Sequence, residues 1–310
     1  MRIVRRLEEF KPASGSIVTI GTFDGVHRGH QKIIQRLREI RSEHGGEITI
    51  LTFDPHPRKV LFPDQTDLKL ITTTAEKCEL LRQFGVDNVI VYPFTKEFSK
   101  LQAGEYIESI LVKGLHTEML VIGYDHRFGS NREGNIDTLR AISGTTGFKI
   151  EEIPAQDIDH INVSSTRIRK AIEEGDMDTA NQFLGYTFFI QGTVVKGKQL
   201  GRTIGYPTAN IRVEDRDKIL PHMGVYAVYA EVLGKRYKGM LNVGTNPTTD
   251  TDHNIKVEVN IFDFDRDIYD ETIRVEFVKR TRDELKFKGL EELIAALRND
   301  RETTLAILSE

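Results

Sequence analysis

Cysteine is almost absent from this chain of 310 residues, which contains only Cys78. A single cysteine excludes an intramolecular disulfide and any zinc site built from several cysteines. Cys78 lies in TTTAEKCELLRQFG, which has the pattern of a helix, so we interpret it as a packed thiol. The chemistry of this protein must therefore come from other residue types.

Long apolar runs and a strong net charge are also missing. No stretch approaches the ~20 apolar residues that cross a bilayer, and the basic start MRIVRRLEEF leads into KPASGS rather than into an apolar signal region. A net charge of −4 gives no bulk attraction to nucleic acid or anionic lipid. We expect a cytoplasmic protein without nucleic-acid or membrane partners, and a monomer or weak homo-oligomer.

The length favours two domains, and the pattern changes near Gly185. Residues 1–185 alternate strand-like segments such as Ile17–Ile20 with helix-like segments such as 27–45. This order predicts an α/β domain with a parallel, Rossmann-like sheet, whose ligands bind at the carboxyl ends of the strands.

Residues 186–310 contain six consecutive strand-like runs separated by glycine, aspartate, asparagine and proline turns. Six strands without an intervening helix predict an antiparallel barrel or sandwich. The amphipathic tail LEELIAALRNDRETTLAIL predicts a closing helix at the C-terminal end.

The first chemical constellation is GTFDGVHRGH, at a strand-to-helix turn. Gly21 and Gly25 allow the backbone to approach a ligand, and the N–H groups of the following helix start can bind phosphate. His27 and His30 lie three residues apart, so both imidazoles can face one anion. Later in the same half, SSTRIR places Ser164, Ser165 and Arg167 at a helix start, where hydroxyls and a guanidinium can hold phosphate oxygens.

The second constellation is GKQLGRTIGYPTAN in the barrel half. Its loop carries Lys196, Lys198 and Arg202, which can meet ATP phosphates. Thr208 and Asn210 are two residues apart in a strand-like run, so they share a face and offer oxygen ligands that suit Mg²⁺.

These motifs resemble two known families. GTFDGVHRGH is similar to the HxGH element of the nucleotidyltransferase superfamily, in the form found in bacterial flavin adenylyltransferases, and SSTRIR resembles that superfamily's second signature. PTAN after a glycine-containing loop resembles riboflavin kinase, a six-stranded barrel. Because four motifs follow in the right order over roughly residues 14 to 305, the chain resembles the bifunctional riboflavin kinase/FMN adenylyltransferases.

The resemblance implies specific site residues. Glu258 stands at the catalytic carboxylate position, and TFDPHPRKV and GYDHRFGSNREGN correspond to flavin-site loops. The implied ATP-binding residues are Gly21, Phe23, Gly25, His27, His30, Ser164, Ser165, Arg167, Lys198, Gly201 and Gly205. The implied flavin-binding residues are Asp54, Pro55, His56, Pro57, Asp125 and Phe128. One departure from the family is GTNPTTD, residues 244–250, where Thr249 and Asp250 replace the usual aromatic or apolar residue.

The sequence thus predicts ATP-dependent phosphorylation of riboflavin to FMN and adenylylation of FMN to FAD, with Mg²⁺ as cofactor. Three alternatives remain. The first domain could act on nicotinamide mononucleotide or phosphopantetheine, the protein could bind flavin without catalysis, or one half could be degenerate. A zinc site that includes His56 and His126 is a weaker option, because no HExxH pattern is present.

Overall fold

A computed structural model describes residues 1–65, 67–124, 127–130, 133–154, 163–197, 199–245 and 255–309. The chain divides into two compact units, Met1–Ser165 and Thr166–Glu310. The predicted functional boundary at residue 185 stays a prediction.

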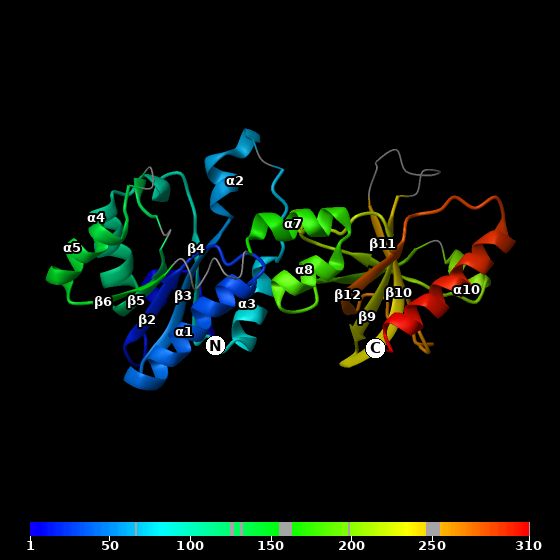
Figure 1. Ribbon diagram of the computed structural model, residues 1–310, viewed down its shortest axis with the longest axis horizontal. Helices are drawn as coiled ribbons and strands as arrows, with labels where there is room; N and C mark the ends of the chain where they lie inside the picture. The colour runs from blue at the N-terminus through cyan, green and yellow to red at the C-terminus, as the bar shows by residue number, and fades with distance from the viewer. Residues whose placement is uncertain are drawn as a thin grey trace. The chain divides into compact units, whose positions relative to one another are not determined.

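The first unit is an α/β domain, as predicted (Figure 1). Its strands are β1 (Arg2–Val4), β2 (Ser16–Ile20), β3 (Glu47–Asp54), β4 (Asn88–Pro93), β5 (Thr117–Gly123) and β6 (Lys149–Ile153). Its helices are η1 (Leu7–Glu9), α1 (Arg28–His44), α2 (Pro57–Leu61), η2 (Pro63–Gln65), α3 (Thr74–Gln83), η3 (Phe98–Lys100), α4 (Ala103–Tyr106), η4 (Ile107–Gly114) and α5 (Ile136–Thr146).

All six strands form one parallel sheet in the order β1-β4-β3-β2-β5-β6. Successive connections from β2 lead through β3 to β4 in one direction, whereas β5 and β6 lie on the other side of β2. Right-handed crossovers therefore place α1 and α3 on one face and η4 and α5 on the opposite face (Figure 1). Such a reversal of strand order opens a crevice at the carboxyl ends of β2 and β5, where ligands bind in folds of this class.

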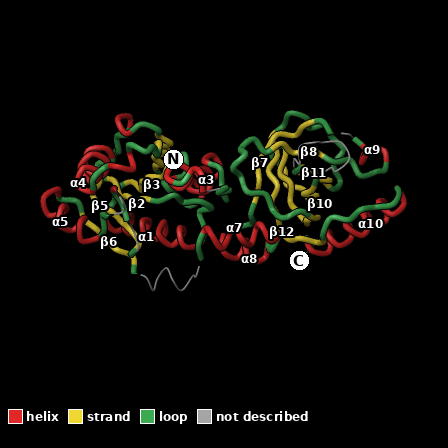
Figure 2. The backbone as a smooth tube through the Cα atoms, turned by 90° about the horizontal axis from the view of Figure 1, so that it is seen from above, coloured by secondary structure: helices red, strands yellow, loops and turns green. Residues whose placement is uncertain are grey.

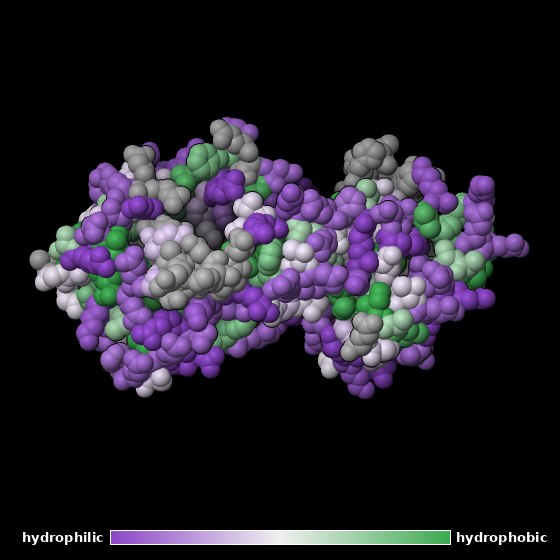
Figure 3. Space-filling model, in the orientation of Figure 1, coloured by the Kyte–Doolittle hydropathy of each residue, from purple (hydrophilic) through white to green (hydrophobic). Residues whose placement is uncertain are grey.

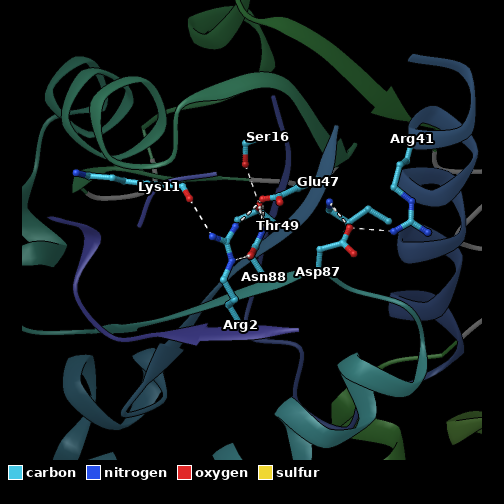
Figure 4. Close-up of polar contacts among 9 residues, drawn as sticks. Arg2, Lys11, Ser16, Arg41, Glu47, Thr49, Asp87 and Asn88 are labelled. Atoms are coloured by element: carbon cyan, nitrogen blue, oxygen red, sulfur yellow. Dashed lines mark hydrogen bonds and ion pairs between the residues drawn. The ribbon is translucent and has the colours of Figure 1, made fainter. Parts of the chain in front are cut away.

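A polar network occupies the opposite, amino-terminal end of the sheet (Figure 4). The amide of Asn88 accepts a hydrogen bond from Arg2 at 2.8 Å and donates to Glu47 at 3.0 Å and to Thr49 at 3.3 Å. Ser16 donates to the same Thr49 hydroxyl at 2.8 Å. These contacts join residues at the start of four strands and stabilise this end of the sheet.

The second unit is a closed barrel with a C-terminal helix, as predicted, and it also includes helices before the first strand (Figure 2). Its strands are β7 (Phe189–Val195), β8 (Ala209–Arg212), β9 (Gly224–Val232), β10 (Lys235–Gly244), β11 (Lys256–Ile261) and β12 (Thr272–Arg282). Its helices are α7 (Ser165–Glu174, whose first residue ends the first unit), α8 (Met177–Leu184), α9 (Leu200–Thr203) and α10 (Leu290–Ile307).

The barrel closes in the order β10-β11-β8-β7-β12-β9 with every neighbouring pair antiparallel. Alternation puts Ile190 and Val194 of β7 and Ile273, Val275 and Phe277 of β12 in its interior. The amide of Asn181 ties α8 to the barrel, since it donates to the Phe277 carbonyl at 2.9 Å and accepts from the Phe188 N–H at 2.7 Å. Helix α10 packs on β9, β10 and β12.

Two local features were not predicted. Arg2–Val4 forms the edge strand β1, because Arg2 is anchored by Asn88 of the neighbouring strand. The helical segment 103–114 is α-helical only to Tyr106 and continues as a π-helix, η4. Among the described residues, no helix has the length and apolar character needed to span a membrane.

Candidate active sites

The turn after β2 holds three residues with positive φ, namely Phe23 at 49°, Gly25 at 80° and Val26 at 36°. At Gly25 a Cβ would lie 2.9 Å from the Ile71 side chain, so only glycine fits both the conformation and the space. The carboxylate of Asp24 stabilises the turn by accepting from the N–H groups of Ile71 at 3.3 Å and Thr72 at 3.1 Å.

The two predicted histidines lie together at the start of α1. His27 is the N-cap, 7% exposed, and its Nδ1 accepts the His30 N–H at 3.4 Å. The imidazoles stack with centroids 3.7 Å apart, and Gly29 leaves room because a Cβ there would lie 3.2 Å from the His27 ring. Burial, and then the nearby His27 and Lys77, hold the pKa of His30 well below its usual value. His30 is therefore a neutral imidazole at physiological pH.

The Nδ1 atom of His30 is buried and has no hydrogen-bond partner among the described residues. It lies beside the first turn of α1, where backbone N–H groups and the helix dipole attract an anion. The ring of Phe23 packs 4.7 Å from the His30 ring and is 1% exposed. Phe23 thus supports the His30 imidazole from within the core.

The second signature meets the same turn. Ser165, the first residue of α7, donates its hydroxyl to the Asp24 carbonyl at 3.1 Å, and Ser164 precedes it. Arg167 belongs to the second unit, where its guanidinium lies 5.0 Å from the centre of the Phe183 ring. The structure thus brings Ser165 to the turn before His27, and Arg167 follows two residues later in α7.

The predicted flavin loop follows the end of β3, the neighbour of β2. Asp54 accepts the Thr74 hydroxyl at 3.0 Å, and His56 is the N-cap of α2, which starts at Pro57. The Asp54–Pro55 peptide bond is cis. In the space-filling view this part of the first unit shows a recess beside α2 (Figure 3).

Phe128 is buried and belongs to a run of aromatic rings that sequence reasoning missed. Its ring lies 5.4 Å from Tyr106, which lies 5.9 Å from Phe98, which in turn lies 5.8 Å from Phe53. Phe53 is the last residue but one of β3 and Phe98 lies in η3 after β4, so their places near the carboxyl ends of parallel strands were the available signal. Asp125, also predicted to bind flavin, and His126 lie outside the described residues.

In the barrel, the predicted kinase residues lie on adjacent strands. Glu258 of β11 pairs directly with Asn210 of β8 on one side and with Asn242 of β10 on the other. Directly paired residues point to the same face of a sheet. Thr208 lies just before β8. The amide of Asn210 packs against the backbone of Gly197, because a Cβ there would lie 2.2 Å from it.

Glu258 lines a cavity of about 260 Å³ between strands β10 and β11, helix α10 and the segment 201–208. Its wall is apolar at Met240, Leu285 and Leu297 and polar at Asn242, Asn260 and Arg282. Alternation along β11 does point Glu258 away from the barrel interior, since Val257 and Val259 are buried. That outer face is covered, so it forms a binding cavity rather than open surface.

A second cavity of about 300 Å³ adjoins Thr208 on its other side. Its lining combines charged and polar residues, including Arg202, Asp265 and Arg266, with apolar ones such as Val259 and Ile268. Gly201 lines the cavity of Glu258, and Gly205 has a φ of +84° in the turn after α9. Lys198 and residues 246–250 of GTNPTTD lie outside the described residues.

Sequence reasoning missed an ion pair at the edge of the Glu258 cavity. Arg282 of β12 donates to Asp300 of α10 through Nε at 2.8 Å and Nη2 at 2.6 Å, and Asp300 is 2% exposed. A single aspartate within an otherwise apolar helix stripe was the only signal, and the sequence did not show which cation it meets.

The fold and sites define a class: an HxGH-type α/β nucleotide-binding domain joined to a barrel with a kinase-like carboxylate. The FAD synthetase family model matches residues 9–167, and the riboflavin kinase model matches residues 184–308. The chain therefore belongs to the family of bifunctional riboflavin kinase/FMN adenylyltransferases, which confirms the predicted fold and both predicted activities.

Relatives of that name agree over the full length. The Listeria monocytogenes protein is 40% identical over 95% of this chain and 93% of its own, and the Pseudomonas fluorescens protein is 37% identical over 97% and 96%. A crystal structure described as a macrolide-efflux protein from Streptococcus pneumoniae has a TM-score of 0.86 and 33% identity over 97% of both chains. The same two-part fold therefore exists in an experimental structure.

Proposed function

We propose that the barrel transfers the γ-phosphate of ATP to riboflavin, and that the α/β unit then joins the FMN product to the AMP moiety of a second ATP. One observation carries the kinase assignment: Thr208 lines both barrel cavities, while Glu258 lines one of them. A phosphate held at Thr208 from one cavity and a hydroxyl held at Glu258 from the other would meet where the cavities adjoin.

Each cavity offers groups that suit one substrate. The Glu258 cavity has an apolar wall that can hold a flavin ring, with amides and Arg282 at its polar edge. The other cavity has the guanidinium groups of Arg202 and Arg266, which can bind phosphate oxygens, beside the carboxylates of Asp265 and Asp267. Glu258 accepts the proton of the riboflavin 5′-hydroxyl as its oxygen attacks the γ-phosphorus, and ADP leaves.

Mg²⁺ fits the oxygen donors at this junction. The Thr208 hydroxyl and the Asn210 amide are hard ligands of the kind that Mg²⁺ accepts beside nucleotide phosphates and water. The described residues contain no group of three histidine, cysteine, aspartate or glutamate side chains that could hold a metal alone. A cation would thus be held largely by the phosphates, and when bound it neutralises their charge.

In the α/β unit, an FMN phosphate oxygen attacks the α-phosphorus of ATP and pyrophosphate leaves. His27, neutral His30 and the N–H groups of α1 stabilise the charge on the transferred phosphoryl group. Ser164, Ser165 and Arg167 complete the phosphate site, with Gly21 and Gly25 letting the backbone approach. Asp54 to Pro57, Asp125 and Phe128 hold the flavin. No protein nucleophile is needed, since the reaction depends on positioning two anions.

The test is a time course of purified protein with riboflavin, ATP and Mg²⁺, with the flavins separated by chromatography. FMN followed by FAD supports both activities in this order. FMN alone would restrict the function to the barrel. If neither riboflavin nor supplied FMN were converted, the proposal would be wrong, and nicotinamide mononucleotide and phosphopantetheine would be tested as acceptors.

A further inference from the structure

Lys77 is a buried lysine that the reactions above do not use. It lies in the middle of α3, is 6% exposed, and belongs to no ion pair among the described residues. Its Nζ donates to the Thr22 carbonyl at 3.1 Å and to the Thr52 hydroxyl at 2.9 Å. The Thr52 hydroxyl donates to the same carbonyl at 3.0 Å. One ammonium thus joins α3 to the ends of β2 and β3.

Removing an ammonium group from water costs free energy, so the burial of Lys77 requires a physical explanation. Burial lowers the pKa of Lys77, while Asp24 of the turn, Cys78 of α3 and Asp54 of β3 oppose that shift. The direct hydrogen-bond partners of Nζ among the described residues are instead two neutral oxygens, the Thr22 carbonyl and the Thr52 hydroxyl. A lysine whose role was only to fill space could be replaced by an apolar side chain without this cost.

The partners of Lys77 point to the catalytic turn. Thr22 is the first residue after Gly21, and it opens the segment in which Phe23, Gly25 and Val26 have positive φ. Such a backbone persists only where surrounding contacts over-determine it. Asp24 and Thr72 hold the far side of this segment, and Lys77 holds its start.

His27 follows this segment directly, so its direction depends on the turn. The imidazole of His30 stacks on that of His27 and lies against the Phe23 ring, which the same turn places. Any movement of Thr22 therefore changes the positions of both imidazoles relative to the start of α1.

We propose that Lys77 is a positioning residue for adenylyl transfer: its ammonium holds the Thr22 carbonyl and the Thr52 hydroxyl, and so fixes the turn that presents His27 and His30 to the nucleotide phosphates. The inference rests on the adenylyl transfer proposed above.

Because Lys77 is charged, its positioning role can be distinguished from simple packing through the pKa of His30. The groups that face His30 and affect its titration are His27 of α1 and Lys77 of α3, and both lower its pKa. Removing the ammonium lets the pKa of His30 rise. The acidic limb of the pH profile for FAD formation should then move to higher pH.

The experiment compares Lys77→Met and Lys77→Arg with the wild type, using Lys113→Met as the matched control. Lys113 is an exposed lysine of η4 in the same unit. FAD formation from supplied FMN is measured against pH, and FMN formation by the barrel serves as an internal standard for intact enzyme. A wild type that makes no FAD would refute the proposed function itself, before any variant is compared.

We expect Lys77→Met to reduce kcat for FAD formation about 100-fold, the cost of a misplacement of roughly 1 Å. FMN formation should be unchanged in Lys77→Met. The acidic limb of the pH profile for FAD formation should shift to higher pH in this variant, and it should return to its wild-type position in Lys77→Arg. A full rate in Lys77→Met would overturn the proposal. So would a reduced rate with an unshifted limb, which indicates a structural role alone. If Lys77→Met does not fold, a wild-type rate and limb in Lys77→Arg support the proposal, and a low rate in that variant with its charge retained contradicts it.

Discussion

Glu258 and Asn210 are direct partners in the antiparallel register of β11 and β8. Residues paired in this way have Cβ atoms about 4.5–5.5 Å apart and face the same side of the sheet. The proposed general base and a proposed Mg²⁺ ligand are thus neighbours, although 48 positions separate them in the chain. Their proximity is a property of the barrel register.

Glu258→Ala should remove FMN formation and leave FAD formation from supplied FMN intact. Loss of a general base costs about 10²–10⁴-fold in rate. The control is Glu231→Ala, an exposed glutamate of β9 that lines neither barrel cavity. Both activities are measured by chromatography of the flavins. An active Glu258→Ala enzyme would show that another group accepts the proton.

His30→Ala should give the opposite result, with FAD formation lost and FMN formation retained. One lost donor to the phosphoryl group in transfer costs about 10²–10³-fold in kcat. The same flavin assay, started from riboflavin, should show FMN accumulating. Loss of both activities in a folded variant would mean that the two sites are not independent.

The buried imidazole of His30 should also make the first unit less stable in acid. Its pKa lies well below the usual value because it is buried and faces His27 and Lys77. An unfolded histidine titrates near pH 6.5, so below that pH the unfolded chain binds a proton that the folded chain does not. Stability therefore falls as the pH decreases through this window, until the folded pKa is reached.

Hydrogen exchange of peptides from β2 and β3 measures this effect in the first unit alone. Between about pH 7 and about pH 5, the wild type should lose more protection, corrected for intrinsic exchange, than His30→Gln. His44→Gln, which alters an exposed histidine of α1, should behave as the wild type does. Equal losses in the wild type and His30→Gln would show that His30 is not responsible.

Arg282→Met should destabilise the second unit and weaken FMN formation. It leaves the buried carboxylate of Asp300 without its bidentate partner, at a cost of about 3–5 kcal/mol. Arg236→Met breaks a more exposed pair with Glu276 and should cost no more than about 1 kcal/mol. Hydrogen exchange of peptides from β12 and α10 compares the two. A small effect at Arg282 would mean that Asp300 is solvated once its partner is gone.

The sequence alone determined the order of elements, the run of six strands in the second half and the motifs that carry the chemistry, while the resemblance to riboflavin kinase implied the barrel. Hydrophobic periodicity and turn residues are local properties, so the strands around His27 and Thr208 were predictable. Gly25 was singled out from the sequence as a position of close backbone approach, whereas the His27 ring that crowds a Cβ at Gly29 became visible only in the structure.

The tertiary structure determined which residues from distant parts of the chain contact one another. Alternation along β11 shows only that Glu258 points outward, and α10 with residues 201–208 turns that outer face into a cavity. The Arg282–Asp300 pair and the contacts of Lys77 with Thr22 and Thr52 join elements that are distant in the sequence. Such contacts depend on helix packing and strand pairing between distant segments, which local sequence patterns do not reveal.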